Sequence, residues 1–214
     1  MKPIKSSDVI IKVLLDLIMK GEIRPGDKVP SAENLAKNTG TSVISAREAV
    51  QNLAGIGLVE IVHGRGIFLT EGAPVIEELL EARKVIESST VIMAARNLNP
   101  ESLEEMERLL EKMEASLAAG DTELFSELDY QFHFFLGKAS GNRILLKTLE
   151  NIKELLRYQQ ATINRLPDII HISALRHREI FNAIKQGNPE LAGVIMDKHI
   201  SEVIHTWKKS AGSV

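Results

Sequence analysis

Residues 29–59 read VPSAENLAKNTGTSVISAREAVQNLAGIGLV, and this stretch decides the fold of the N-terminal part of the chain. A Pro-Ser pair precedes a short amphipathic helix, a turn containing Gly40 follows, and a second helix begins near Ser42. Ser31 and Ser42 are each placed to cap the backbone N–H groups at a helix start. Two short helices joined by a tight turn predict a helix-turn-helix, which presents the first turn of its second helix to the DNA major groove.

The next segment, GLVEIVHGRGIFLT over residues 57–70, alternates apolar and polar residues on both sides of a glycine-rich tip. This pattern predicts two short strands that form a hairpin. A helix-turn-helix followed by a hairpin is a winged helix, so we predict a DNA-binding domain over residues 1–71. The residues expected to contact double-stranded DNA are Ser31, Ser42, Ser45, Arg47, His63, Gly64, Arg65 and Gly66.

Charge and composition agree with this prediction. Residues 1–70 carry nine Lys and Arg against seven Asp and Glu, whereas residues 71–214 carry 17 against 22. This asymmetry is typical of a basic part that meets phosphate and an acidic part that does not. The absence of cysteine excludes disulfides and thiolate metal sites. With no apolar run near the roughly 20 residues of a membrane span and no signal-peptide pattern, we expect a cytoplasmic protein without membrane contact.

The N-terminal pattern resembles the GntR family of bacterial transcription regulators. The matching positions are Pro30, Ser31, Leu35, Ala36, Gly40, Ser42, Arg47, Glu48, Ala49, Leu53, Gly57, Leu58, Val59, Gly64, Arg65, Gly66 and Phe68. The resemblance implies a homodimer that places two recognition helices on a palindromic operator. Two positions depart from the pattern: Ala32 stands where the family usually has Glu, and Val43 stands where an Arg usually opens the recognition helix. We therefore expect an apolar DNA contact from Val43, such as to a thymine methyl, and an operator unlike the family's usual one.

After a short hinge at residues 71–74, the chain shows only helical periodicity. Asn-Pro-Glu at 99–101 and 188–190, Gly-Asp at 120–121 and Gly-Asn at 141–142 mark helix boundaries by their caps and stops. These marks divide a domain over residues 74–210 into about six helices: 74–98, 100–119, 121–139, 142–165, 167–186 and 189–209. Short connections favour antiparallel neighbours. The predicted fold class is therefore mainly α, a winged helix-turn-helix followed by an all-α antiparallel bundle.

Four polar side chains in this domain share helix faces with apolar residues. Asp129 and His133 stand four apart beside Phe125 and Phe132, while His177 and His199 each lie on the apolar face of another helix. For any one of them, a structural role in the core is the simpler interpretation. Together they favour a divalent metal, because an ionised carboxylate buried without a partner costs several kcal/mol. Imidazole and carboxylate ligands suit zinc or nickel, and also manganese or cobalt.

The same domain resembles the FCD ligand-binding domain of the FadR subgroup. The matching positions are Arg83, Glu87, Ala94 and Ala95, then Asp129, Phe132, His133 and Leu136, and finally His177, Ile180, Ala183, Ile184, Gly187, Asn188, Ala192, Met196, His199 and Ile200. The resemblance implies a metal held by Asp129 and the three histidines, with a small carboxylic acid effector near it or on it. Arg83 is the expected clamp for the effector carboxylate, and an i,i+4 pair with Glu87 is its alternative role. Six helices would be more similar to the VanR-type branch than to FadR itself.

We therefore expect a ligand-responsive transcription regulator and not an enzyme. One alternative keeps the regulator but makes the histidines structural and the effector pocket metal-free. The other alternative, a helical-bundle metalloenzyme, is disfavoured because no second acid is placed as a general base and the paired Glu-x-x-His motifs of di-iron bundles are missing. His171, near a helix start, and His205, whose face neighbours Ser201 and Lys208 indicate solvent, are expected to have no functional role.

Overall fold

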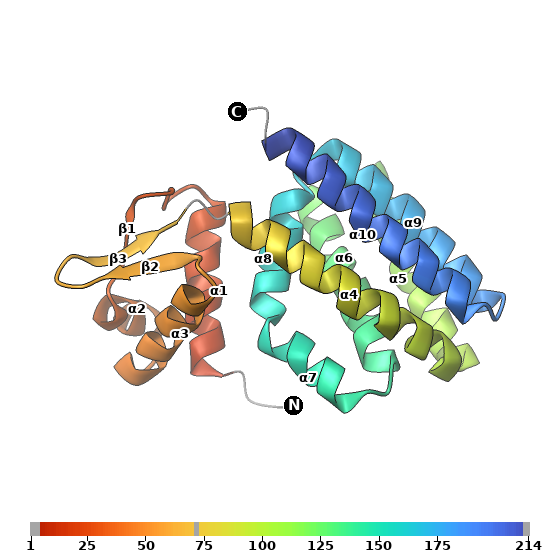
Figure 1. Ribbon diagram of the computed structural model, residues 1–214, viewed down its shortest axis with the longest axis horizontal. Coiled ribbons are helices and arrows are strands. Elements are labelled where there is room, and N and C mark those ends of the chain that lie inside the picture. The colour runs from red at the N-terminus through yellow and green to blue at the C-terminus, as the bar shows by residue number, and fades with distance from the viewer. Residues whose placement is uncertain (1–4, 71–72, 212–214) are drawn as a thin grey trace. The chain divides into compact units, whose positions relative to one another are not determined.

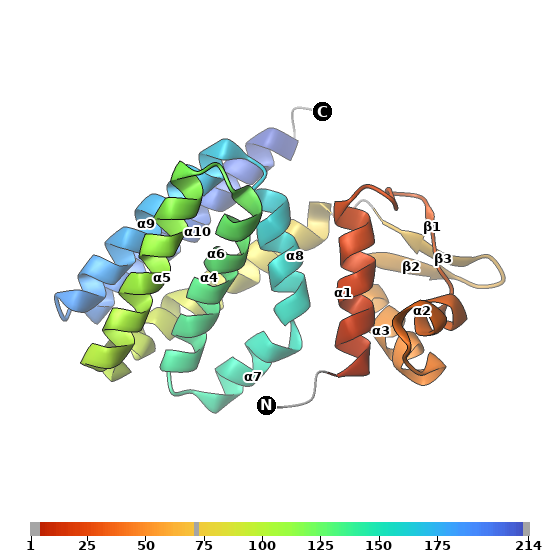
Figure 2. The ribbon, with the colours of Figure 1, turned by 180° about the vertical axis from the view of Figure 1, so that it is seen from behind.

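The computed structural model describes residues 5–70 and 73–211. The chain folds as two compact units, Met1–Ile76 and Glu77–Val214, which we call the head and the tail. Figure 1 and Figure 2 show the two units from opposite sides. Glu71 and Gly72, the first half of the predicted hinge, lie outside the described residues.

The head contains a three-helix unit and a small sheet. Its elements are α1 (Ser6–Met19), β1 (Lys28–Val29), α2 (Ala32–Thr39), α3 (Val43–Gly55), β2 (Val59–Val62) and β3 (Gly66–Leu69). The strand order is β1-β3-β2 with both pairs antiparallel, and β2 faces β3 from Val59 opposite Leu69 to Val62 opposite Gly66. Helices α2 and α3 with the β2–β3 hairpin confirm the predicted winged helix-turn-helix.

Local signals set the boundaries of the two helix-turn-helix helices. Ser31 Oγ accepts a hydrogen bond from the Asn34 backbone N–H at 3.3 Å, and Ser42 Oγ accepts one from the Ser45 backbone N–H at 3.0 Å. Gly40 ends α2 in the left-handed conformation with φ 65°, which favours glycine. Both predicted serine caps are therefore confirmed.

The tail is helical throughout its described residues. Its elements are α4 (Ala73–Asn97), α5 (Pro100–Ala118), α6 (Thr122–Ala139), α7 (Arg143–Asn151), α8 (Lys153–Ile163), α9 (Pro167–Lys185) and α10 (Pro189–Ala211). Asn99, Asp121 and Asn142 cap α5, α6 and α7, as their positions in the sequence predict. The helix expected over 142–165 is interrupted at Ile152, whose φ of −109° and ψ of 12° leave the helical range. Seven helices thus replace the expected six, so the helix count no longer favours the VanR-type branch.

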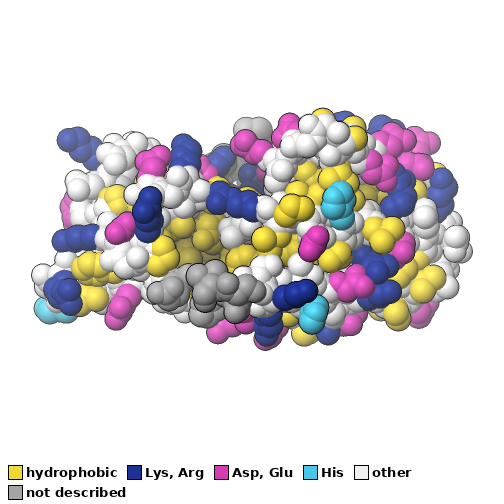
Figure 3. Space-filling model, turned by 90° about the horizontal axis from the view of Figure 1, so that it is seen from above, with side chains coloured by type: hydrophobic (Ala, Val, Ile, Leu, Met, Phe, Trp, Pro, Cys, Tyr) yellow, Lys and Arg dark blue, Asp and Glu magenta, His cyan; other side chains and the backbone are white. Residues whose placement is uncertain are grey.

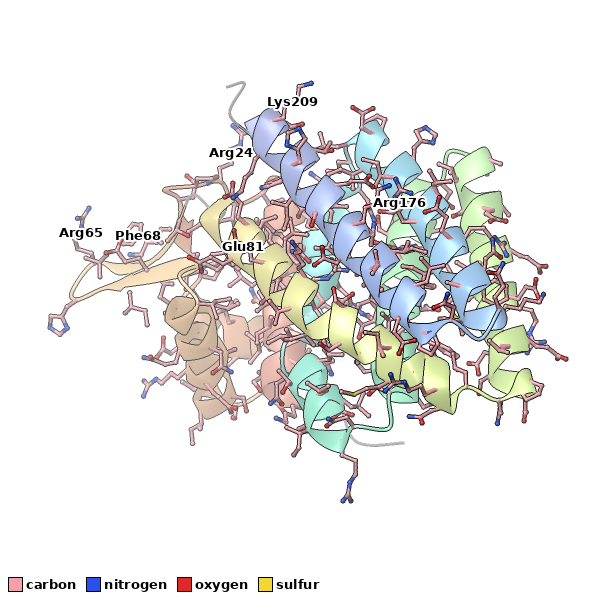
Figure 4. All side chains as sticks on the ribbon, turned by 45° about the vertical axis from the view of Figure 1, so that its right-hand side comes forward. Arg24, Arg65, Phe68, Glu81, Arg176 and Lys209 are labelled. Atoms are coloured by element: carbon pink, nitrogen blue, oxygen red, sulfur yellow. The ribbon has the colours of Figure 1, made fainter. Side chains whose placement is uncertain are left out.

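Close packing and ion pairs hold the tail helices together. Helix α9 packs along α10 and also against α5, which in turn packs against α6. Arg176 of α9 joins α10 through a 2.7 Å contact from its Nε to Glu202 Oε2 (Figure 4). At Gly193 of α10 an added Cβ would lie 2.6 Å from Ile92 Cδ1 of α4, so only glycine permits this approach. The inward faces of α4, α6, α9 and α10 therefore meet in one core.

Candidate metal centre and DNA-binding surface

Three histidines from three helices meet in the core of the tail. His133 comes from α6, His177 from α9 and His199 from α10, and they are 6%, 0% and 2% exposed. His177 Nε2 lies 3.2 Å from both His133 Nε2 and His199 Nε2. Their metal-binding atoms all lie within 4.8 Å of one another. The structure thus brings together the three histidines that the sequence places on inward helix faces.

Asp129, one turn before His133 on α6, adds a carboxylate to this cluster. Its Oδ1 lies 3.5 Å from the Nε2 atoms of both His133 and His177. Its Oδ2 accepts a 3.0 Å hydrogen bond from Asn164 Nδ2 of the segment after α8. Asp129 is buried, and its Oδ1 has no hydrogen-bond partner among the described residues. Because an orphaned buried oxygen is costly, this atom points to a ligand that carries positive charge.

The spacing of these atoms fits a divalent metal ion. Zn–N bonds of about 2.0–2.1 Å place neighbouring ligand nitrogens about 3.0 Å apart in octahedral geometry and about 3.4 Å apart in tetrahedral geometry. The observed Nε2 separations of 3.2 Å lie between these two values. Three imidazoles with one carboxylate suit zinc, nickel, manganese or cobalt, and such a set leaves coordination positions open.

A chain of charged and polar groups supports His133 from the side of α4. His133 Nδ1 lies 2.5 Å from Glu87 Oε2, and Glu87 Oε1 accepts a 2.7 Å hydrogen bond from Arg83 Nε. Arg83 Nη1 in turn donates to Gln159 Oε1 at 2.9 Å. A carboxylate on the far nitrogen of a metal-binding histidine fixes the ring and keeps Nε2 available. Sequence reasoning named Glu87 only as the neighbour of Arg83 and missed this second role.

Sequence reasoning also missed the polar residues that α8 and its C-terminal end contribute. Gln159, Gln160 and Asn164 are each no more than 1% exposed. They share the inner face of this segment with the buried Leu156 and Ile163. The signal in the sequence is that Gln159 and Gln160 lie between Leu156 and Ile163, two apolar residues whose spacing places them on the inner face of the helix.

Burial and neighbouring charges shift the pKa values of the cluster. Burial would raise the pKa of Glu87, but the charges of Arg83 and His133 lower it below its usual value. Burial would also raise the pKa of Asp129, which the neighbouring His133 imidazole and the charge of His177 lower instead. Burial lowers the pKa of His177 well below 6.5 and that of His199 to about 3. Two neutral imidazoles beside two carboxylates are the protonation states that a cation requires.

The pKa of His133 shifts in the opposite direction from the pKa values of His177 and His199. Burial would lower its pKa, but the negative charge of Glu87 outweighs this effect and raises the pKa above 6.5. A metal ion bound at His133 Nε2 therefore competes with a proton for this ring.

A small cavity adjoins the cluster and includes Arg83. Its lining residues are Arg83, Glu87, Tyr130, His133, Phe134, Leu149, Leu156 and Gln160, and its empty volume is about 220 Å³. Arg83 is 3% exposed. The structure thus places Arg83 both in the i,i+4 pair with Glu87 and on the wall of the cavity, so the two expected roles are compatible.

The residues expected to contact DNA lie at the surface of the head. Ser31, Ser42, Arg47, His63, Gly64 and Arg65 are exposed, whereas Ser45 and Gly66 are half-buried. Arg47 Nη2 lies 3.3 Å from Glu33 Oε1 of α2. Arg65 lies near the tip of the β2–β3 hairpin with its side chain directed away from the sheet (Figure 4). Gly66 has φ 126°, and an added Cβ would lie 2.5 Å from Lys28 Cε. The backbone at this tip therefore requires glycine.

Val43, from which an apolar DNA contact is expected, is half-buried and packs against the head core. The next residue, Ile44, is 80% exposed. Successive residues of an α-helix point about 100° apart, so a shift of one position exchanges a core face for a solvent face. Ile44 is therefore the apolar side chain that the first turn of α3 presents outward.

His171 is exposed, and so is His205, as expected. On the face drawn in Figure 3, basic and acidic side chains are interspersed, with hydrophobic side chains between them. Among the described residues, no helix combines the length and apolar character that crossing a membrane requires.

These features define a winged-helix DNA-binding unit linked to a helical ligand-binding unit, and comparison with known proteins identifies both. Residues 6–69 match the family model for bacterial regulatory proteins of the gntR family, and residues 78–202 match the model for the FCD domain. The chain belongs to the GntR family, in its FadR subgroup with an FCD domain. It is therefore a DNA-binding transcription regulator with an effector domain, and its families and relatives are regulators rather than enzymes.

Individual relatives resemble the chain over nearly its full length. The transcriptional regulator LutR of Bacillus subtilis is 29% identical over 208 residues, which cover 87% of this chain and 94% of LutR. An Escherichia coli protein whose name assigns it to regulation of an L-lactate dehydrogenase operon is 26% identical, covering 97% of this chain and 88% of that protein. The solved structure of E. coli McbR/YncC superimposes with a TM-score of 0.72 at 20% identity, covers 98% of this chain and 100% of that chain, and shows the shared fold.

Proposed function

We propose that this regulator binds one divalent metal ion through Asp129, His133, His177 and His199, and that a small carboxylic acid bound beside the metal modulates its affinity for DNA. The observation that carries the proposal is the convergence of three buried Nε2 atoms on a carboxylate oxygen without a hydrogen-bond partner. Zinc and nickel are the expected metals, with manganese and cobalt as further candidates. A bound metal would supply a positive charge and an open coordination position to the effector.

Arg83 is the proposed clamp for the effector carboxylate. It lies on the cavity beside the histidine cluster and is 3% exposed. A guanidinium has five N–H donors, and the bonds to Glu87 and Gln159 use two of them. A charge-assisted hydrogen bond to a carboxylate in this buried position is stronger than one between neutral groups. The relative named for an L-lactate dehydrogenase operon is consistent with a small organic acid as the effector.

The head would bind a palindromic operator as part of a homodimer. The first turn of α3 would enter the major groove with Ser42, Ile44, Ser45 and Arg47, while His63, Gly64, Arg65 and Gly66 of the hairpin tip, with Ser31, would contact the adjacent backbone and groove. Support for this arrangement comes from the exposure of Arg47, Arg65 and Ile44.

Helix α4 is the element through which effector binding would change the affinity for DNA. It carries Arg83 and Glu87, and it is the first element after the winged helix in the chain. A displacement of α4 on effector binding would change how the two winged helices of a dimer are spaced. Such a switch requires that the effector binds the two arrangements with different affinity.

Elemental analysis of protein purified without chelators or a metal-affinity resin tests the proposal. Wild type and the control variant His171→Ala, which removes an exposed histidine from the same helix as His177, are expected to contain about one metal ion per chain. His177→Ala is expected to lose the metal while its winged helix keeps its circular dichroism and DNA affinity. Full occupancy in His177→Ala, or wild type that stays metal-free after incubation with divalent ions, would favour purely structural histidines.

A further inference from the structure

Gln160 of α8 lies on the cavity wall but has no role in the proposed metal and carboxylate sites. It is 1% exposed and lines the cavity together with Arg83, Glu87 and His133. Its side-chain oxygen has no hydrogen-bond partner among the described residues. A buried amide oxygen without a donor is costly, so this atom marks a position where a ligand's donor group would be stabilised.

The protein groups nearest to this cavity do not supply that donor. Arg83 directs Nε to Glu87 and Nη1 to Gln159, and His133 directs Nδ1 to Glu87. The remaining wall consists of Tyr130, whose hydroxyl interacts with Arg157, and of Phe134, Leu149 and Leu156, which carry no side-chain donor. A hydrogen-bond donor for Gln160 Oε1 would therefore come with the ligand.

The surrounding charges favour a neutral donor over a charged one. Glu87 is the carboxylate on the cavity wall, and its two oxygens face Arg83 Nε at 2.7 Å and His133 Nδ1 at 2.5 Å. An ammonium group beside Gln160 would have Arg83 as a like-charged neighbour and no free carboxylate as a partner, which makes its burial unfavourable. A hydroxyl group donates one hydrogen bond without adding charge.

We infer that the effector is a small hydroxy acid whose hydroxyl group donates to Gln160 Oε1 while its carboxylate binds Arg83. The inference rests on the proposed function and specifies its ligand class. The apolar side chains of Phe134, Leu149 and Leu156 on the cavity wall would face the short alkyl part of an acid of few carbon atoms.

Titration calorimetry of the metal-loaded full chain with four three-carbon acids tests this assignment. Lactate, propionate, pyruvate and alanine differ only in the group on the second carbon, which is a hydroxyl, hydrogen, carbonyl or ammonium. Wild type is expected to bind lactate about ten-fold or more tighter than each of the other three, because a buried acceptor rejects ligands that lack its donor. Preference for pyruvate would show that the amide N–H₂ faces the ligand and would overturn the inference, as would preference for alanine.

The variant Gln160→Met tests whether Gln160 or the metal selects the hydroxyl group of the ligand. In Gln160→Met, lactate affinity is expected to fall about ten-fold to that of propionate, while propionate affinity and metal content stay unchanged. Unchanged propionate binding also shows that the variant is folded. Gln186→Met, which alters an exposed glutamine after α9, serves as the matched control. If lactate keeps its advantage in Gln160→Met, the metal selects the hydroxyl and the inference fails.

The proposed function fails in a different way. If the carboxylate clamp is wrong, Arg83→Ala binds all four acids as wild type does, whatever Gln160→Met shows. If wild type binds all four acids equally and Arg83→Ala binds none, the clamp holds and only the role of Gln160 is lost. If none of the four acids binds wild type, both the effector assignment and the role of Gln160 are rejected.

Discussion

The head and the tail each use an arginine–glutamate pair, but in opposite surroundings. The Arg47 and Glu33 side chains of the head are 70% and 60% exposed, whereas those of Arg83 and Glu87 in the tail are 4% and 5% exposed. Arg47 can leave Glu33 for a phosphate or a base because water and salt already screen the pair. Arg83 has no such freedom, since it also holds Gln159 and supports the Glu87 contact to His133.

In the head, the side chains proposed to bind DNA are not needed for folding. In the tail, the candidate ligand-binding side chains also stabilise the fold. The side chains proposed to contact DNA stand outside the head core, so their loss should change binding and leave folding intact. In the tail, the candidate ligands are also core residues, and each supports the next. The predictions below test this contrast, beginning with the largest expected effect.

The largest effect is expected for Arg83→Ala in the metal-loaded protein. The substitution leaves the Glu87 carboxylate buried without its cation, and breaking a buried pair in this way costs about 3–5 kcal/mol of unfolding free energy. Urea denaturation followed by circular dichroism measures the change. Arg47→Ala is the matched control, for which no measurable loss of stability is expected. Similar unfolding free energies for the two variants would show that the tail pair is as dispensable for folding as the head pair.

Acidification of the metal-free protein should destabilise the tail next most strongly. The folded-state pKa values of His177 and His199 lie below 6.5, with His199 at about 3. Unfolded chains therefore take up these two protons as the pH falls below about 6.5, while the folded tail does not, so stability is lost from there downward. His133, whose pKa is raised, is already protonated in the folded tail below pH 6.5 and adds no difference in this range. The net difference approaches two protons, which corresponds to about 2.7 kcal/mol per pH unit.

Peptide-resolved hydrogen exchange at several pH values separates the two units. Protection in α6, α9 and α10 of the metal-free protein should fall between about pH 6.5 and 5, while protection in α2 and α3 stays constant. Bound metal should move the loss to lower pH, because it keeps all three imidazoles deprotonated. Equal loss of protection in α2 and α3 would contradict the contrast between head and tail.

The sequence predicted the head more completely than the tail because signals in the head are local. Ser31 and Ser42 accept hydrogen bonds from backbone N–H groups three residues further along, and Gly40 and Gly66 occupy backbone conformations that glycine favours. Such features depend on a few neighbouring residues, which a single sequence displays. Val43 shows the limit of such prediction. Neighbouring residues of α3 lie on the core face and on the solvent face, and helix ends are defined only to within one or two residues.

In the tail, the sequence predicts on which face of a helix a side chain lies, but not which helix faces pack against each other. The four-residue spacing of Asp129 and His133 predicts a shared inward direction, which the structure has. The contact of His133 with Glu87 joins residues 46 positions apart in the chain, and no periodicity encodes it. The interruption at Ile152 has no glycine or proline to announce it. Ile152 packs against the cluster of Tyr130, Leu149 and Leu156, a tertiary environment that local propensity does not display.

A smaller effect, on binding rather than folding, is expected for Arg47→Ala at the operator. Losing one phosphate contact should weaken binding and reduce the slope of log K against log salt concentration by about 0.9. Fluorescence anisotropy over a range of salt concentrations with an operator selected in vitro measures both. Arg108→Ala removes the same charge from an exposed position on α5 of the tail. The salt dependence of its operator binding should equal that of wild type. An unchanged slope for Arg47→Ala would place this side chain away from the DNA backbone.

The smallest effect distinguishes the two neighbouring apolar residues at the start of α3. Ile44 is 80% exposed, and contact of its side chain with a thymine methyl is worth about 0.8 kcal/mol per buried methyl-sized group. Ile44→Ala should therefore weaken operator binding about four-fold without changing stability, whereas Val43→Ala should lower stability because Val43 packs on the head core. Replacing thymine by uracil throughout the operator removes the methyl groups themselves. This replacement should weaken wild type but leave Ile44→Ala unaffected, and an equal loss for both proteins would mean that Ile44 reads no methyl group and its exposure serves another purpose.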